Sequence, residues 1–255
     1  MPIRIVHLTD LHWHANPEYQ LMGVNTRQSL HSVLKDIQSD SPPPDLILIT
    51  GDLAQDESAE SYQQLQTLFN ALKIPVYVLP GNHDNPALMQ EFLNTDWIST
   101  QQQILLNSWQ IVMLDSSVAN SDGGKLENAQ LQSLEQYLTQ YPKLHALICV
   151  HHQPVPVGTQ WLDTMTIENG KQFMALLQRY PQAKIVLWGH VHQDYSCQQG
   201  HLQLLASPAS CRQFLPGAKD YAIDPLKGAG YRELTLIEDG THETHVNWLS
   251  RQPDH

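Results

Sequence analysis

Short apolar runs and longer amphipathic segments alternate along most of the chain. The apolar runs predict strands at Ile3 to Leu8, Leu46 to Thr50, Val76 to Leu79, Ile111 to Leu114, Ala146 to Val150 and Ile185 to Trp188. Apolar positions spaced by three and four residues predict helices at Thr26 to Gln38, Ser58 to Leu72, Gln130 to Tyr141 and Lys171 to Tyr180. Asn25 and Gln28 resemble a capping box, and Pro86 after Asn85 suits the first position of another helix.

Helical periodicity stops near residue 200. Strands are expected after that point at Leu202 to Ala206, Leu234 to Glu238 and Thr244 to Trp248. Alternating strands and helices, followed by a strand-rich C-terminal part, predict an α/β protein with two sheets packed face to face and helices outside. Ser207 to Gly230 is rich in Pro and Gly, so we expect a long loop there that borders the functional site.

Polar clusters follow five of the predicted strands. They read Thr9-Asp10-Leu11-His12, Thr50-Gly51-Asp52, Gly81-Asn82-His83-Asp84, Val150-His151-His152 and Gly189-His190-Val191-His192. In open α/β sheets, ligands bind beyond the carboxyl ends of the strands, so five such clusters can converge on one crevice. We interpret residues 1–255 as one domain, because a boundary between positions 10 and 192 would divide this crevice.

The clusters contain candidate metal ligands of three kinds: Asp10, His12, Asp52, Asn82, His151, His190 and His192. Carboxylate, amide and imidazole donors without cysteine suit iron, manganese or zinc. In an extended loop, the rings of His190 and His192 would leave the same face, so each could bind one ion of a pair. Asp52, alone in its cluster, is the natural carboxylate to bridge both ions.

Two adjacent ions predict a phosphoesterase, because they lower the pKa of bound water towards about 7 and stabilise phosphoryl oxygens. His83 is placed to protonate the leaving alkoxide, with Asp84 or Asp56 as the carboxylate that keeps its ring protonated. One Asp-x-His or His-x-His sequence is weak support, whereas five clusters in this order are specific. Most other histidines are expected to be structural, and strand alternation would turn His152 away from a site that contains His151.

Charge and composition narrow the class of partner. The formal net charge of −12 disfavours nucleic acid, which usually binds a basic face. Two divalent ions would still make the pocket locally positive and suited to a small phosphate ester.

The N-terminus lacks a secretory signal and no apolar run approaches a membrane span, so we expect a cytoplasmic protein without a membrane partner. Three cysteines without C-x-x-C spacing argue against a disulfide framework. Nothing in the sequence indicates the oligomeric state.

The ordered clusters resemble the motifs of the calcineurin-like metallophosphoesterases from residue 10 to residue 192. Further segments are similar to bacterial class III 3′,5′-cyclic AMP phosphodiesterases, namely Leu21 to Thr26, Gly51 to Asp56, Leu79 to Asp84, Ser207 to Cys211 and Gln213-Phe214. The resemblance implies a four-layer αββα sandwich of two mixed β-sheets flanked by helices. It also implies two iron or manganese ions per chain and hydrolysis of cyclic AMP to 5′-AMP.

The resemblance also implies roles for individual residues. The first metal would be held by Asp10, His12, Asp52 and His192, and the second by Asp52, Asn82, His151 and His190. His83 would be catalytic, and the nucleotide site would be lined by His12, Asp52, Asn82, His83 and His192. Many relatives carry an orienting Asp three residues after the bridging Asp, where this chain has Gln55 and the acid falls at Asp56.

The substrate is less closely defined than the chemistry. We hypothesise that Trp161, Leu162 and Asp163 help to form the wall beside the nucleotide base. One alternative is a broader phosphodiesterase or a DNA nuclease, although a linear nucleic acid should need a basic track. An alternative of another class is a scaffold protein that kept the fold and lost the metals, against which the intact ligand set argues.

Overall fold

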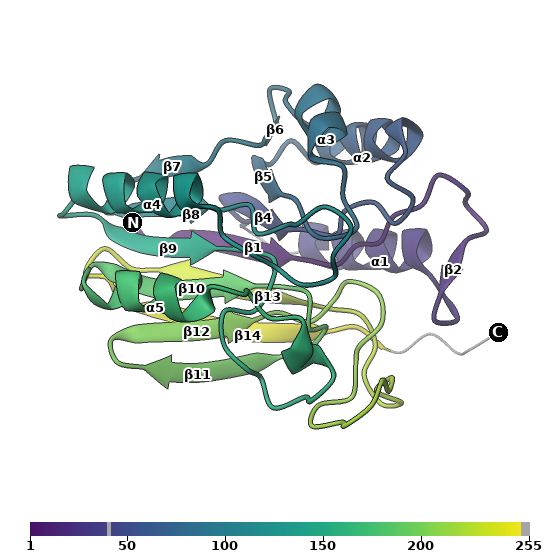
Figure 1. Ribbon diagram of the computed structural model, residues 1–255. Helices are drawn as coiled ribbons and strands as arrows, with labels where there is room; N and C mark the ends of the chain where they lie inside the picture. The colour runs from purple at the N-terminus through teal and green to yellow at the C-terminus, as the bar shows by residue number, and fades with distance from the viewer. Residues whose placement is uncertain (40–41, 251–255) are drawn as a thin grey trace.

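The computed structural model describes residues 1–39 and 42–250, and two six-stranded mixed sheets packed face to face form its centre (Figure 1). The first sheet has the order β14-β13-β1-β4-β5-β6. Its strands are β1 (Ile3–Leu8), β4 (Leu46–Thr50), β5 (Val76–Leu79), β6 (Ile98–Ser99), β13 (Gly230–Leu236) and β14 (His242–Trp248). Strands β1, β4, β5 and β6 are parallel neighbours, whereas β13 runs antiparallel to β1.

The second sheet has the order β11-β12-β10-β9-β8-β7. Its strands are β7 (Gln103–Leu106), β8 (Trp109–Met113), β9 (His145–Cys149), β10 (Ala183–Trp188), β11 (Tyr195–Gln199) and β12 (Leu202–Ala206). The four central strands are parallel, and the two edge strands are antiparallel to their neighbours. A short hairpin of β2 (Gln20–Leu21) and β3 (Val24–Asn25) lies outside both sheets.

The helices lie on the outer faces of the two sheets. The first sheet is covered by α1 (Thr26–Ser39), α2 (Ala59–Leu72) and α3 (Pro86–Phe92), and the second by α4 (Asn128–Gln140) and α5 (Gly170–Gln178). Side chains cap two of these helices: Ser58 accepts from the Ser61 amide, and Asn85, which precedes Pro86 at the expected helix start, accepts from the Ala87 and Leu88 amides. Asn25 Oδ1 accepts from the Gln28 amide at 3.0 Å, which is the first half of the expected capping box.

Three apolar layers hold these elements together. A middle layer between the sheets includes Ile5, Leu48, Ile111, Leu147 and Leu187, and the two outer layers pack the sheets against their helices. The central strands are therefore buried on both faces, which explains their continuous apolar sequences. The predicted αββα sandwich is confirmed. Within the described residues, no helix is long and apolar enough to cross a bilayer.

Three edge strands, β6, β7 and β11, were not expected from the sequence, and β6 is only two residues long. Strand β11 is mostly exposed and polar, and β7 buries only one of its residues fully. Strands β11 and β7 are defined by their backbone pairing with β12 and β8. Backbone pairing does not require an apolar sequence pattern, so the sequence did not indicate these two strands. The predicted C-terminal strands begin earlier than expected, because β13 pairs with β14 from Gly230 onward.

Candidate metal centre

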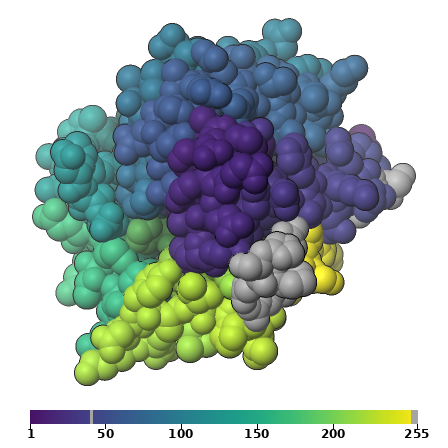
Figure 2. Space-filling view, turned by 90° about the vertical axis from the view of Figure 1, so that its right-hand side faces the viewer, coloured from purple at the N-terminus to yellow at the C-terminus, as the bar shows by residue number. Residues whose placement is uncertain are grey.

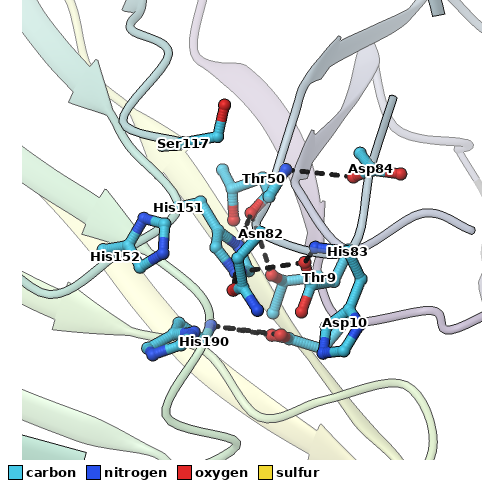
Figure 3. Close-up of polar contacts among 12 residues, drawn as sticks. Thr9, Asp10, Thr50, Asn82, His83, Asp84, Ser117, His151, His152 and His190 are labelled. Atoms are coloured by element: carbon cyan, nitrogen blue, oxygen red, sulfur yellow. Dashed lines mark hydrogen bonds and ion pairs between the residues drawn. The ribbon is translucent and has the colours of Figure 1, made fainter. Parts of the chain in front are cut away.

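The five polar clusters meet at one end of the sandwich. They follow β1, β4 and β5 of the first sheet and β9 and β10 of the second, and their side chains converge there (Figure 3). Four overlapping groups of three donors each have ligand atoms within 4.8 Å of one another. The groups are Asp10, His12 and His192; Asp10, Asp52 and His151; His12, Asp52 and His83; and His151, His152 and His190.

Several of these side chains are directed into the site by residues in the left-handed backbone conformation. Positive φ angles of 46° to 64° occur at Asp10, His12, Asp52, His190 and His192. The expectation of an extended segment at His190 and His192 is therefore wrong, and two left-handed residues direct these rings instead. A β-carbon on Gly189 would lie 1.8 Å from Thr9 Oγ1, so only glycine fits where the two sheets meet at the site.

One half of the centre is built around Asp10. His192 Nε2 lies 3.3 Å from Asp10 Oδ1 and 3.2 Å from His12 Nε2. His192 Nδ1 donates to the Arg212 carbonyl at 2.7 Å, which leaves the lone pair of Nε2 directed into the site. The His190 amide donates to Asp10 Oδ2 at 2.9 Å, so this carboxylate also fixes the loop that carries both histidines.

The other half is built around Asp52 and Asn82. His151 Nε2 lies 3.3 Å from Asp52 Oδ1 and 3.0 Å from Asn82 Oδ1, while its Nδ1 donates to the Thr50 carbonyl at 2.7 Å. His190 Nε2 is buried and has no hydrogen-bond partner among the described residues. A buried ring nitrogen without a partner is costly, and a cation at this position would satisfy it.

The two buried carboxylates of the centre are ionised. Burial alone would raise the pKa of Asp10, but the charge and hydrogen bond of His192 lower it to about 2. Burial likewise opposes ionisation of Asp52, and His151 shifts the pKa of that carboxyl well below its usual range. Two anionic groups in a fully buried position need a positive partner, and a divalent cation provides one.

Two histidines of the centre, His12 and His190, are held neutral, as metal ligands must be. Burial is the main cause that lowers the pKa of His12 to about 4 and that of His190 to about 3. His151 differs, because the effect of burial on its pKa is outweighed by Asp52, Asp10 and the Thr50 carbonyl together, which raise the pKa to about 9. Cation binding at His151 Nε2 would therefore displace a proton. The donor set and its ionisation both fit a metal centre.

A cavity of about 310 Å³ opens onto the centre. All five residues that the family resemblance places in the nucleotide site line it, namely His12, Asp52, Asn82, His83 and His192. His190 also lines the cavity, whereas Asp10 and His151 are fully buried behind it. The remaining wall is largely apolar.

The expected orienting carboxylate for His83 is absent among the described residues, and Gln55 takes its place. Gln55 Nε2 lies 3.3 Å from His83 Nδ1. The Asp84 carboxylate instead accepts from the amides of Leu53, Ala54 and Gly81 and from the Tyr62 hydroxyl. The Asp56 carboxylate accepts from the amides of Ala15 and Ser58. Both carboxylates hold loops rather than the His83 ring.

His152 lies closer to the centre than strand alternation suggested. Its ring centroid is 4.6 Å from that of His190, and its Nδ1 contacts Ser116 Oγ at 2.9 Å. Strand β9 ends at Cys149, so the alternation assumed for the next residues does not apply. Asp163 also differs from expectation, because its carboxylate accepts from the Val157 and Gly158 amides and does not line the cavity.

His7 has a structural role, as expected for the histidines outside the clusters, and it supports the centre from behind. Its Nε2 contacts Thr50 Oγ1 at 2.7 Å, and its Nδ1 contacts Ser207 Oγ. The same Ser207 hydroxyl accepts from Arg232 Nε at 3.2 Å. Burial, followed by the charge of Arg232, lowers the pKa of His7 to about 3. A neutral buried histidine thus links the end of β4 to the loop after β12.

Comparison with known proteins agrees with this geometry. Residues 3–194 match the calcineurin-like phosphoesterase family. The chain is 38% identical to the 3′,5′-cyclic adenosine monophosphate phosphodiesterase CpdA of Pseudomonas aeruginosa, covering 96% of this chain and 89% of that protein. It is 37% identical to the 3′,5′-cyclic-nucleotide phosphodiesterase alr5338 of Nostoc sp., covering 96% and 92%.

A solved structure shares the fold at low sequence identity. A dimetal phosphatase from Danio rerio superposes with a TM-score of 0.66 and 13% identity, covering 96% of this chain and 99% of that one. Five clusters in one order, their convergence at a single end of an αββα sandwich and the family match lead to one assignment. The chain belongs to the calcineurin-like phosphoesterase family.

Proposed function

We propose that this protein hydrolyses 3′,5′-cyclic AMP to 5′-AMP at a centre of two metal ions. The observation that carries the proposal is the position of Asp52 between two donor sets. Its Oδ2 lies 3.7 Å from His12 Nε2, and its Oδ1 lies 3.3 Å from His151 Nε2. One carboxylate with each oxygen directed at a different histidine is suited to bridge an ion pair.

The donors divide into two sets that share Asp52. Asp10, His12, Asp52 and His192 would hold the first ion. Asp52, Asn82, His151 and His190 would hold the second. These nitrogen and oxygen donors suit iron or manganese, and zinc is compatible with the same set. When bound, the ions supply the charge that activates water and stabilises the phosphoryl oxygens.

His83 is the catalytic residue in this proposal. Its ring lies at the cavity wall, 5.2 Å from the ring of His12. Its amide donates to Asp52 Oδ1 at 2.9 Å, which fixes the backbone of His83 to the centre. Hydrolysis to 5′-AMP breaks the bond between phosphorus and O3′, and His83 would deliver a proton to that oxygen.

Cyclic AMP fits the surroundings of this centre better than a polynucleotide. The protein carries a formal net charge of −12, which disfavours a long polyanion. A small cyclic diester carries a single negative charge and can enter a cavity of about 310 Å³. The two relatives named above are phosphodiesterases of cyclic nucleotides, and one is specified for cyclic adenosine monophosphate.

The test is turnover after reconstitution with defined metals. Protein loaded with iron or manganese should convert cyclic AMP to 5′-AMP alone, identified by chromatography. Its kcat/KM for cyclic AMP should exceed that for bis(p-nitrophenyl) phosphate. Equal values would indicate a broad phosphodiesterase instead. Fewer than about one metal per chain, with no activity after reconstitution, would favour a scaffold protein.

Substitution of His83 tests the assignment of the acid. His83→Ala should keep both metals and lose about 100- to 10,000-fold in kcat, with the greatest loss for poor leaving groups. His245→Ala is a matched control, because that side chain is exposed on edge strand β14. Loss of metal in His83→Ala would instead identify His83 as a ligand.

A further inference from the structure

The cavity over the metal centre has two chemically different ends. One end carries the predicted ligands, and the other is an apolar wall formed by Leu21, Met22, Trp161, Leu162, Met165 and Phe214. Three separate segments supply this wall: the β2–β3 hairpin, the segment around the short helix η1 (Leu162–Thr164) and the loop of residues 207–230. Figure 2 faces this end of the molecule and shows the purple N-terminal segment beside yellow-green residues of the C-terminal third.

Aromatic rings connect the centre to this wall. The Phe214 ring stacks on His192 with centroids 4.4 Å apart and planes 24° apart. Trp161 meets Phe214 edge to face at 4.8 Å. Tyr221 packs against both rings at 5.3 Å and 5.6 Å from the outer side, where it is half exposed. The three rings pack against one another, so each supports the position of the others.

We propose that Trp161 and Phe214, together with Met22, form the binding subsite for the purine base of the cyclic nucleotide. This inference rests on the proposed function, because it takes the phosphate to lie over the ion pair. The base is joined to that phosphate through a short, rigid sugar, so it must occupy the same cavity. Flat aromatic and thioether surfaces bind either face of a purine, and polar groups are few on this wall.

A second cavity could also receive the base, but its lining residues are less suited to a purine. It measures about 480 Å³ and shares Asn82, His83 and Asp122 with the first. Its other lining residues are mostly polar or small, including Ser117, Asn120 and Ser121, with Pro86 and Val118 as apolar exceptions, and none is Phe, Trp or Tyr. A purine there would lose water without gaining a stacking partner. The aromatic side therefore sets the orientation of the substrate.

The experiment compares substrates with and without a base in the metal-loaded enzyme. Trp161→Ala should raise KM for cyclic AMP about 10- to 100-fold. It should change turnover of trimethylene phosphate, a cyclic diester without a base, by less than twofold. Trp161→Phe should restore most of the affinity. Trp97→Ala is the matched control, because that indole is part-exposed before β6 and does not line the cavity.

Binding gives a second readout that does not depend on turnover. Addition of 5′-AMP to the loaded wild-type enzyme should quench tryptophan fluorescence, and ribose 5-phosphate should quench it far less. Equal loss on both diesters in Trp161→Ala, or equal quenching by both phosphates, would overturn the base subsite and leave the hydrolytic function intact. A wild-type enzyme that cleaves neither diester would instead contradict the proposed function.

Discussion

Asp84 links two of the loops that form the centre, and its replacement should destabilise the protein strongly. The carboxylate accepts from the Leu53 and Ala54 amides beside Asp52 and from the Gly81 amide beside Asn82, all at 3.0–3.1 Å. The Tyr62 hydroxyl is a fourth donor, at 3.0 Å. Asp84 is buried, so water does not readily replace it.

The cost follows from the donors left without an acceptor. In Asp84→Ala, three backbone amides lose theirs, and a buried unsatisfied donor costs about 1–3 kcal/mol. We expect a loss of about 3–6 kcal/mol, which is a large part of the total of about 5–15 kcal/mol typical of native proteins. In Asp84→Asn, the amide oxygen can serve the Oδ1 donors while its NH2 group opposes the Gly81 amide. That variant should therefore lose about 1–3 kcal/mol.

Urea unfolding of the metal-free variants measures these losses, and metal content measures their effect on the centre. Both Asp84 variants should also bind metal more weakly, because the loops that carry Asp52 and Asn82 lose their common anchor. Asp239→Ala is the control, since that exposed carboxylate accepts from Thr241 in a local turn. If Asp84→Ala unfolded like Asp239→Ala but lost turnover, Asp84 would act in catalysis and the anchoring argument would be refuted.

Three further predictions concern other parts of the site. The pKa of His7 is lowered by burial to about 3, so its contribution to stability is complete above pH 6.5 and is lost as the pH falls towards 3. From pH 7 to pH 5 this loss is about 2 kcal/mol, and the pH dependence of urea unfolding should be shallower by that amount in His7→Gln. Gln55→Ala removes the contact with the His83 ring and should lower kcat about 2- to 10-fold with metals retained. The shorter side chain in Gln55→Asn should not restore kcat fully. An unchanged kcat in Gln55→Ala would exclude a positioning role for Gln55. Gly189→Ala should cost about 1–3 kcal/mol in unfolding and weaken metal binding, whereas Gly123→Ala, where a β-carbon meets nothing closer than 3.7 Å, should do neither.

The strands that carry the site could be predicted closely from the sequence. Strands β1, β4 and β5 begin and end at the predicted residues, because burial on both faces makes each one a continuous apolar run. The convergence of the polar clusters followed from the same pattern, since parallel strands bring their carboxyl ends to one edge. Edge strand β11 carried no such pattern and was missed.

The contacts within the site were less predictable than their location. The left-handed turns at His190 and His192 depend on packing between the two sheets, which no local pattern encodes. The partner of His83 was expected to be a carboxylate, yet the backbone donors around Asp84 compete for that group and leave the ring to Gln55. Local sequence gave the kinds of side chain present, whereas their pairing depended on the tertiary structure.

All five strands that lead into the centre point the same way, which leaves the opposite end of the sandwich available for attachment. The turn between β11 and β12 lies at that end, because β12 runs parallel to β10 and the turn precedes it. Gln199 and Gly200 are exposed in this turn. An affinity peptide or a fluorophore inserted there would attach the protein to a sensor surface and leave the cavity over the metal centre open to the solution.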